Sequence, residues 1–218
     1  MPMLHPGKIT IATYAAFAPV CASDEQGVHG RDVDFLRAFA QQQGLTIEFR
    51  VFLFDRIWER PGRGEVDIAA AGIAPLCERQ CPGVVWSESY FTVERSLLIR
   101  ATDQIRFKTI HDFAGYTIAV TRGSTADIDT QQRKPATAHL VYYDKQERAV
   151  AELLSGKIDA FGTGDVCSHY LVDQHPKQLA VADVHPMAEP EQFAFAVRAE
   201  SDLLPALNAF IRENRLRY

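Results

Sequence analysis

Two short stretches of the sequence carry groups that suit a small anionic molecule. Arg79 follows Glu78, and its planar guanidinium can hold a carboxylate through two parallel hydrogen bonds. The same arginine can equally be read as a solvated surface residue near the start of a helix. Gly123, Ser124 and Thr125 form a predicted strand-to-helix turn, where the first backbone N–H groups of a helix can bind an anion. Ser124 or Thr125 can also cap that helix, and the two roles are compatible.

The sequence contains none of the common catalytic or metal-binding motifs. It has no Gly-x-Ser-x-Gly elbow, no phosphate-binding Gly-x-x-x-x-Gly-Lys and no His-Glu-x-x-His. Cys77 and Cys81 are spaced so that on a helix their Cα atoms would lie about 6 Å apart, which allows either a disulfide or two packed thiols. Cys21 and Cys167 are isolated, and zinc-site spacing is absent. We therefore expect no metal ion and no other cofactor.

The elements that must position these residues alternate between strands and helices. Alternating or continuous apolar runs predict strands over residues 8–13, 46–52, 65–72, 96–100, 116–120, 139–143, 158–162 and 193–198. Helical spacing of apolar residues predicts helices or helical turns over residues 32–40, 55–60, 78–81, 111–115, 147–154 and 203–214, with another opening at 124–125. This order is the βαβ rhythm of an α/β protein with largely parallel sheets, and it occurs twice along the chain.

Length and composition limit the possible classes of protein. The 218 residues allow one large domain or two small lobes, and 47% hydrophobic with 23% charged residues is typical of a globular chain. The net charge of −5 with scattered basic residues argues against nucleic-acid binding. No apolar run reaches the roughly 20 residues of a membrane span. The first eight residues lack the apolar core of a signal peptide. The protein could still be exported if a signal peptide has been removed from this sequence.

Taken in order, short motifs spread over nearly the whole chain resemble the family 3 solute-binding proteins. Each motif alone is weak, but their order and spacing together are specific. They are Tyr14–Pro19, Gly30–Phe35, Gly64–Asp67, Ala71–Ile73, Glu78–Arg79, Trp86–Phe91, Asp112–Gly115, Gly123–Thr125 and Gly156–Ala160.

The resemblance implies a two-lobed type 2 periplasmic binding fold. Two mixed sheets flanked by helices would be joined by a two-strand hinge, with the ligand cleft between the lobes. Lobe 1 would take residues 1–100 and 189–218, and lobe 2 would take residues 101–188. The implied function is binding of a small, amino-acid-like carboxylate in the periplasm by cleft closure. We expect a monomer that delivers its ligand to the membrane permease of an ABC transporter.

The resemblance also implies roles for particular residues. Arg79 matches the arginine that grips the ligand's α-carboxylate, and Ser124 with Thr125 would bind the same carboxylate from lobe 2. Because the residues at the amine-binding stretch are Gly72 and Ala74, only main-chain contacts are expected there. Phe17 and Phe54 match positions that stack on the ligand's side chain, and Tyr14 matches one that senses its polarity. Each of the three could instead be an ordinary core residue.

One position departs from the pattern of amino-acid binders. Where they carry an aspartate that pairs with the ligand's ammonium group, this chain has Gly164, and Asp165 lies one residue later. An unpaired ammonium is costly to desolvate. The departure therefore leaves room for a carboxylate ligand without an α-amine, unless a shifted loop lets Asp165 substitute.

Two alternative functions follow from the same resemblance. Similar domains serve as sensory or regulatory parts of signalling proteins and of lytic transglycosylases. The fold also hosts enzymes similar to cyclohexadienyl dehydratase, so the absence of a catalytic motif does not exclude catalysis, and such an enzyme is the less favoured alternative.

Overall fold

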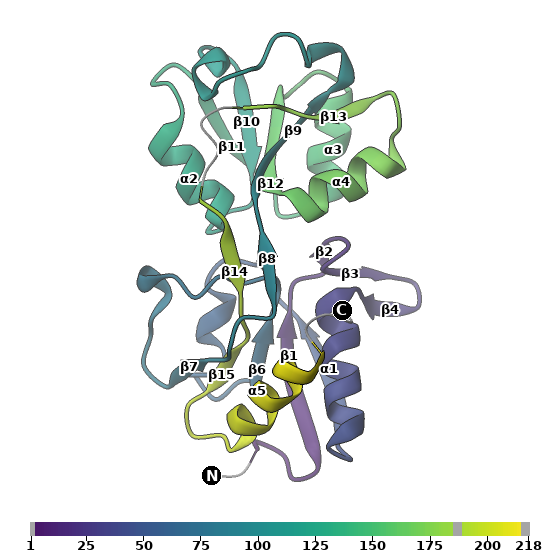
Figure 1. Cartoon of the computed structure of the whole chain (residues 1–218), viewed down its shortest axis with the longest axis vertical. Helices are drawn as coiled ribbons and strands as arrows, with labels where there is room; N and C mark the ends of the chain where they lie inside the picture. The colour runs from purple at the N-terminus through teal and green to yellow at the C-terminus, as the bar shows by residue number, and fades with distance from the viewer. Residues whose placement is uncertain (1–2, 185–188, 215–218) are drawn as a thin grey trace. The chain divides into compact units, whose positions relative to one another are not determined.

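A computed structural model describes residues 3–184 and 189–214 of the chain. By its internal contacts the chain forms two compact units, the first comprising Met1–Thr92 with Gln192–Tyr218 and the second Val93–Glu191. Two segments named in the expected lobes, 185–188 and 215–218, lie outside the described residues. The chain passes between the units twice, at the short strands β8 (Phe91–Val93) and β14 (Glu191–Phe193), which pair with each other (Figure 1).

The first unit is built on a five-stranded mixed sheet. Strand β1 pairs in parallel with β5 and β6, whereas β15 runs antiparallel to both β6 and β7. Phe35 of α1 and Phe210 of α5 meet edge to face with ring centroids 5.0 Å apart, so these two helices pack against each other (Figure 1). In sheet order the strands are β5 (Thr46–Val51), β1 (Lys8–Thr13), β6 (Ile68–Ala70), β15 (Ala196–Arg198) and β7 (Val84–Trp86). The helices are α1 (Arg31–Gln42) and α5 (Leu203–Asn214), with the 3-10 turns η1 (Ile57–Glu59) and η2 (Cys77–Arg79).

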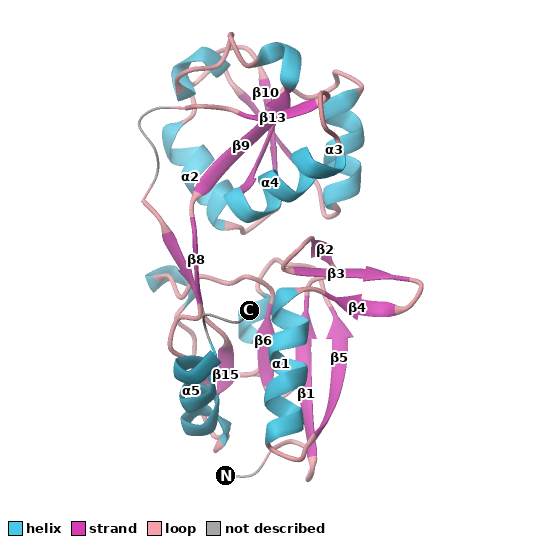
Figure 2. Ribbon diagram, turned by 45° about the vertical axis from the view of Figure 1, so that its right-hand side comes forward, coloured by secondary structure: helices cyan, strands magenta, loops and turns pink. Residues whose placement is uncertain are grey.

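The second unit repeats this plan. Strand β10 pairs in parallel with β11 and β12, and β9 runs antiparallel to β12 and β13. The apolar core of this unit includes Ile118 of β10 together with Phe107 and Phe113. Figure 2 shows the helices α2, α3 and α4 around this sheet. In sheet order the strands are β11 (His139–Tyr142), β10 (Thr117–Val120), β12 (Ala160–Gly164), β9 (Arg95–Arg100) and β13 (Leu179–Val181). The helices are α2 (Thr125–Arg133), α3 (Gln146–Leu154) and α4 (Asp165–Gln174), with the 3-10 turns η3 (Ala101–Asp103) and η4 (Ile110–Phe113).

Several elements differ from the sequence-based expectation. The apolar run 193–198 is not one strand, because it supplies the end of β14 and all of β15. Strand β9, which the expected first lobe included, belongs to the sheet of the second unit. A three-stranded antiparallel sheet of β2 (Ala16–Phe17), β3 (Cys21–Asp24) and β4 (Gly27–His29) occupies a stretch that reads as a loop.

The disulfide hypothesis for Cys77 and Cys81 is wrong, because both cysteines are free. The physical reason lies in the backbone, since the 3-10 turn ends at Arg79. Gln80 is extended, with φ −67° and ψ 128°. The helical spacing that would have brought the two sulfurs together therefore does not form.

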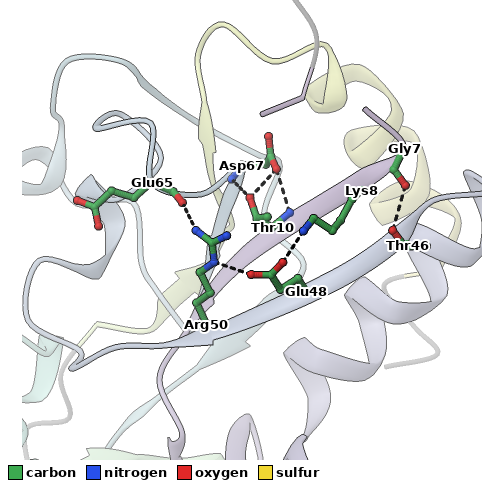
Figure 3. Close-up of polar contacts among 8 residues, drawn as sticks. All are labelled: Gly7, Lys8, Thr10, Thr46, Glu48, Arg50, Glu65 and Asp67. Atoms are coloured by element: carbon green, nitrogen blue, oxygen red, sulfur yellow. Dashed lines mark hydrogen bonds and ion pairs between the residues drawn. The ribbon is translucent and has the colours of Figure 1, made fainter. Parts of the chain in front are cut away.

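The amino-terminal edge of the first sheet is held by a separate polar network (Figure 3). Asp67, fully buried just before β6, accepts hydrogen bonds from the backbone N–H of Leu4 and from both the N–H and the hydroxyl of Thr10. Beside it, Glu48 accepts from the Lys8 ammonium at 2.6 Å and from Arg50 at 2.7 Å. These contacts tie β1, β5 and the start of β6 together.

Among the described residues, no helix has the length and apolar character needed to cross a bilayer.

Candidate ligand-binding site

Arg79 is a buried cation of the first unit. It ends η2, where its own N–H donates to the Leu76 carbonyl at 2.9 Å, and its side chain is only 2% exposed. The guanidinium donates from Nη1 to the Ala74 carbonyl at 2.9 Å. The reading of Arg79 as a solvated surface residue is therefore wrong. A buried guanidinium is costly unless acceptors, aromatic faces or an anion compensate for the lost water.

Aromatic rings form the surroundings of this guanidinium. The Arg79 Cζ atom lies 4.7 Å from the Trp58 ring centroid and 5.7 Å from that of Phe54, within the range of cation–π attraction. Tyr14 meets Phe54 edge to face at 5.7 Å. The structure thus brings the predicted residues Tyr14, Phe54 and Arg79 together. Trp58, one turn after Phe54 in the sequence, was missed, although an aromatic residue at that spacing was the available signal.

The segment after β6 presents backbone groups close to Arg79. Gly72 has φ +60°, and a Cβ added there would lie 2.7 Å from the Phe17 ring, so glycine is required. The carbonyls of Ile73 and Ala74 are occupied, the latter by both Leu76 N–H and Arg79. Among the described residues, neither the Gly72 carbonyl nor the Ala74 N–H has a hydrogen-bond partner. One acceptor and one donor of the main chain therefore remain for a ligand.

The fully buried carboxylate of Asp32 holds this segment through a hydrogen bond to its backbone. Its Oδ2 accepts the Gly72 N–H at 2.8 Å, and its Oδ1 accepts the Tyr90 hydroxyl at 2.5 Å. Burial raises the pKa of Asp32 from 3.8 to about 6, although both hydrogen bonds and the charge of Arg31 act in the opposite direction. Burial, followed by the Asp32 charge, also raises the pKa of Tyr90. This role was not predicted from the sequence, where Asp32 lies only within the Gly30–Phe35 motif and at the start of the predicted helix 32–40.

The predicted residues of the second unit meet at the N-terminus of α2. Ser124 caps the helix, its hydroxyl accepting the Asp127 N–H at 3.1 Å, and Asp127 in turn accepts the Gly123 N–H at 2.9 Å. The capping interpretation of Ser124 is therefore confirmed, while the hydrogen of its hydroxyl stays available for donation. Thr125 is 8% exposed, and its N–H has no hydrogen-bond partner in the part of the chain that the structure describes. Arg122 lies beside this turn, with Cζ 3.9 Å from the Tyr142 ring centroid.

Asp165 is engaged elsewhere in the second unit. It begins α4, and its Oδ1 accepts the Glu94 N–H at 3.1 Å while its own N–H donates to the Glu94 carbonyl at 2.9 Å. It lines a pocket of about 290 Å³ together with Arg95, Arg133 and other residues of this unit. Within the described residues, the lining includes neither Ser124 nor Thr125. The structure does not bring Asp165 into one pocket with them.

Comparison with known proteins places the chain in a family. The sequence model of the family described as bacterial extracellular solute-binding proteins, family 3, matches residues 9–216. The chain belongs to this family. The resemblance stated from the motifs is thereby confirmed.

Solved structures confirm the predicted type 2 periplasmic binding fold. The arginine-bound form of truncated ArgBP from T. maritima is 29% identical, with a TM-score of 0.85 that covers 95% of this chain and 96% of that one. An ancestral arginine-binding protein bound to glutamine is 26% identical, with a TM-score of 0.86 that covers 98% of this chain and 94% of that one.

Two curated relatives are also similar in sequence. A probable histidine-binding protein of Neisseria gonorrhoeae is 31% identical over 100 residues, which is 45% of this chain and 37% of that protein. The amino-acid-binding protein AabA of Dichelobacter nodosus is 27% identical over 191 residues, 86% of this chain and 74% of that protein. The chain thus matches just over a third of the first relative's length and about three quarters of the second's.

Proposed function

We propose that this protein binds an amino acid, or a closely related small carboxylate, outside the cytoplasm and delivers it to the permease of an ABC transporter. The observation that carries the proposal is the buried Arg79 guanidinium, which lies against aromatic rings and beside open main-chain groups. Such a cation binds a carboxylate bidentately, with little competition from water. The names of the relatives, which include histidine-, arginine- and amino-acid-binding proteins, support the same class of ligand.

Each candidate residue has an assigned role in this proposal. Arg79 and the Ala74 N–H hold the ligand's carboxylate, and the Gly72 carbonyl accepts from its ammonium group. Ser124 and Thr125, at the N-terminus of α2, offer donors for a carboxylate of the ligand. The apolar surfaces that select the ligand's side chain belong to Tyr14, Phe17, Phe54 and Trp58.

The carboxylate dominates recognition in this proposal. This chain has Gly164 at the position where amino-acid binders carry an aspartate. The neighbouring Asp165 already hydrogen-bonds to the Glu94 backbone through both its N–H and its carboxylate. The ligand's amine therefore relies on a neutral carbonyl, which is a weaker partner than a carboxylate. We infer that removing the α-amine from a ligand costs less affinity than removing its carboxylate.

We further propose that the protein acts as a periplasmic monomer and binds its ligand without turning it over. Incubation with prephenate or arogenate tests this directly, and formation of a dehydrated product would contradict it. Permease and ATPase genes beside the gene for this protein are the expected genomic context.

A thermal-shift screen tests the ligand class. The panel contains the twenty L-amino acids, their deaminated 2-hydroxy analogues and their decarboxylated amines at millimolar concentration. A ligand that binds only the folded state raises the melting temperature, because the free energy of unfolding rises by RT ln(1 + [L]/Kd). We expect shifts from a subset of the carboxylates and none from the amines. A panel without any shift would contradict the proposal.

A further inference from the structure

The start of α1 places a carboxylate deep in the first unit. The N–H groups of Arg31 and Asp32 donate to the carbonyls of Pro19 and Val20, each at 3.0 Å, which fixes the first turn of the helix against this segment. The approach is close, since a Cβ on Gly30, which has φ +117°, would lie 2.7 Å from the Val20 carbonyl oxygen. Asp32 is consequently held with no exposed surface.

Both oxygens of this carboxylate serve elements distant in sequence. One accepts the N–H of Gly72, forty positions along the chain, and the other accepts the hydroxyl of Tyr90. Tyr90 is itself fixed, because its ring stacks on Phe195 at 4.2 Å and its N–H donates to the Phe193 carbonyl at 3.0 Å. Asp32 thus joins the segment that follows β6 to the residue that precedes β8.

The location of Asp32 distinguishes it from a purely structural acid. Burying a carboxylate is costly, and apolar packing would have been a cheaper way to fill the same space. The residue that Asp32 holds, Gly72, has a backbone in the left-handed region. Gly72 also carries the carbonyl that remains open to a ligand. The hydrogen bond to Asp32 fixes the peptide group that immediately precedes the Gly72 carbonyl, in the segment that leads on to the Ala74 N–H.

We propose that Asp32 is a positioning residue for ligand binding, which holds the Gly72–Ala74 backbone in the orientation that presents its free carbonyl and N–H to the ligand. The proposal rests on the proposed function, because it assumes that these main-chain groups contact the ligand. It adds a residue that touches no ligand itself and acts through the Gly72 amide.

Asp67 provides a matched control within the same unit. It too is fully buried, and its carboxylate accepts three hydrogen bonds, but it lies just before β6, whereas Gly72 lies just after that strand. Loss of either carboxylate removes acceptors from buried donors and destabilises the fold. Only the loss of Asp32 is expected to disturb the candidate site.

The ionisation of Asp32 provides a second readout. The groups that influence its charge are Tyr90 and Arg31, with Cys21 acting on Tyr90. With a pKa near 6, Asp32 becomes ionised as the pH rises through the range that binding assays can cover. A charged acceptor holds the Gly72 N–H more strongly than a neutral one. Ligand affinity should therefore increase as the pH rises through about 6.

The experiment compares the wild type with Asp32→Ala, Asp32→Asn and Asp67→Ala. Amide hydrogen exchange of free protein, followed for Gly72 and its neighbours and corrected for global stability, reports whether the segment is held. Calorimetric titration with L-arginine and with L-glutamine, between about pH 5 and about pH 8, reports affinity for two ligands bound by structural relatives. Asparagine keeps an oxygen for the Gly72 N–H and an amide N–H₂ for the Tyr90 oxygen, so it serves as the conservative variant.

The proposal expects faster exchange at Gly72 and about tenfold or greater loss of affinity in Asp32→Ala. It also expects recovery of most of that affinity in Asp32→Asn, with a flat profile around pH 6. Asp67→Ala should keep wild-type affinity and pH dependence. Unchanged exchange at Gly72, or equal loss of affinity in the two alanine variants, would overturn it.

Two further outcomes are informative. If Asp32→Ala does not fold, the pH dependence of binding by Asp32→Asn decides the question. A pH profile like that of the wild type would overturn the proposal, and a flat profile would support it. If the wild type binds neither amino acid, the proposed function loses support, while the exchange of Gly72 still decides whether Asp32 positions the segment.

Discussion

Replacing Arg79 with alanine should abolish most ligand binding, because Arg79 is the cation that we propose to hold the ligand's carboxylate beside Trp58 and Phe54. Arg79 has 2% exposure and two aromatic rings within 6 Å of its guanidinium, so a ligand carboxylate paired with it would be largely shielded from water. Truncating one partner of a buried, hydrogen-bonded charge pair costs about 2–5 kcal/mol of binding free energy. That range corresponds to an affinity weaker by roughly thirty-fold to several thousand-fold.

Isothermal titration calorimetry with the amino acid that gives the largest thermal shift measures this loss. Arg79→Lys should fall between the wild type and alanine, because lysine keeps the charge but lacks the planar fork. Arg60→Ala is the matched control, since Arg60 also lies over an aromatic ring, Phe52 at 4.4 Å, and pairs with Glu65 at 2.6 Å. Unchanged affinity in Arg79→Ala, or an equal loss in Arg60→Ala, would refute the reasoning.

Three further predictions concern stability and chemical reactivity. Ser124→Ala removes the acceptor for the Asp127 N–H, so chemical denaturation should show a loss of about 0.5–2 kcal/mol, and no loss would argue against the cap. Folding raises the pKa of Asp32 from 3.8 to about 6, so the folded state binds the proton more tightly than the unfolded chain in that interval. Relative to Asp32→Asn, the wild type should therefore lose about 2 kcal/mol of unfolding free energy as the pH rises from about 4 to about 6. A constant difference between the two denaturation series would contradict the assignment. Cys77 is an exposed free thiol, so it should react with a thiol reagent in the native protein without reductant, whereas protection that disappears on reduction would indicate a bond to Cys81.

Sequence reasoning predicted the βαβ plan of both units well, because buried parallel strands and amphipathic helices leave clear periodicities. The helix α5 (Leu203–Asn214) was predicted with the bounds that the structure shows. Helix α4 (Asp165–Gln174) was missed, since its apolar and polar residues do not segregate cleanly onto two faces. The sheet of β2, β3 and β4 was missed because its strands are only two to four residues long, too short for an alternating pattern to show.

The candidate site was predictable where a motif encoded it and not where tertiary contacts create it. Arg79, Tyr14 and Phe54 were named from the sequence, and the structure brings them together. The contact of Trp58 with the guanidinium and the bridge from Asp32 to Gly72 depend on distances across the fold. No local pattern specifies such contacts, because the partners of Asp32 are contributed by segments far along the chain.

In the proposed function, Arg79 anchors the ligand by holding its carboxylate. The most direct test is calorimetric titration of the wild-type protein with each amino acid that raises its melting temperature, and with the amine formed by removing that amino acid's carboxylate. We expect measurable binding of the amino acid and no detectable binding of the amine. Comparable affinity for both members of a pair would contradict it.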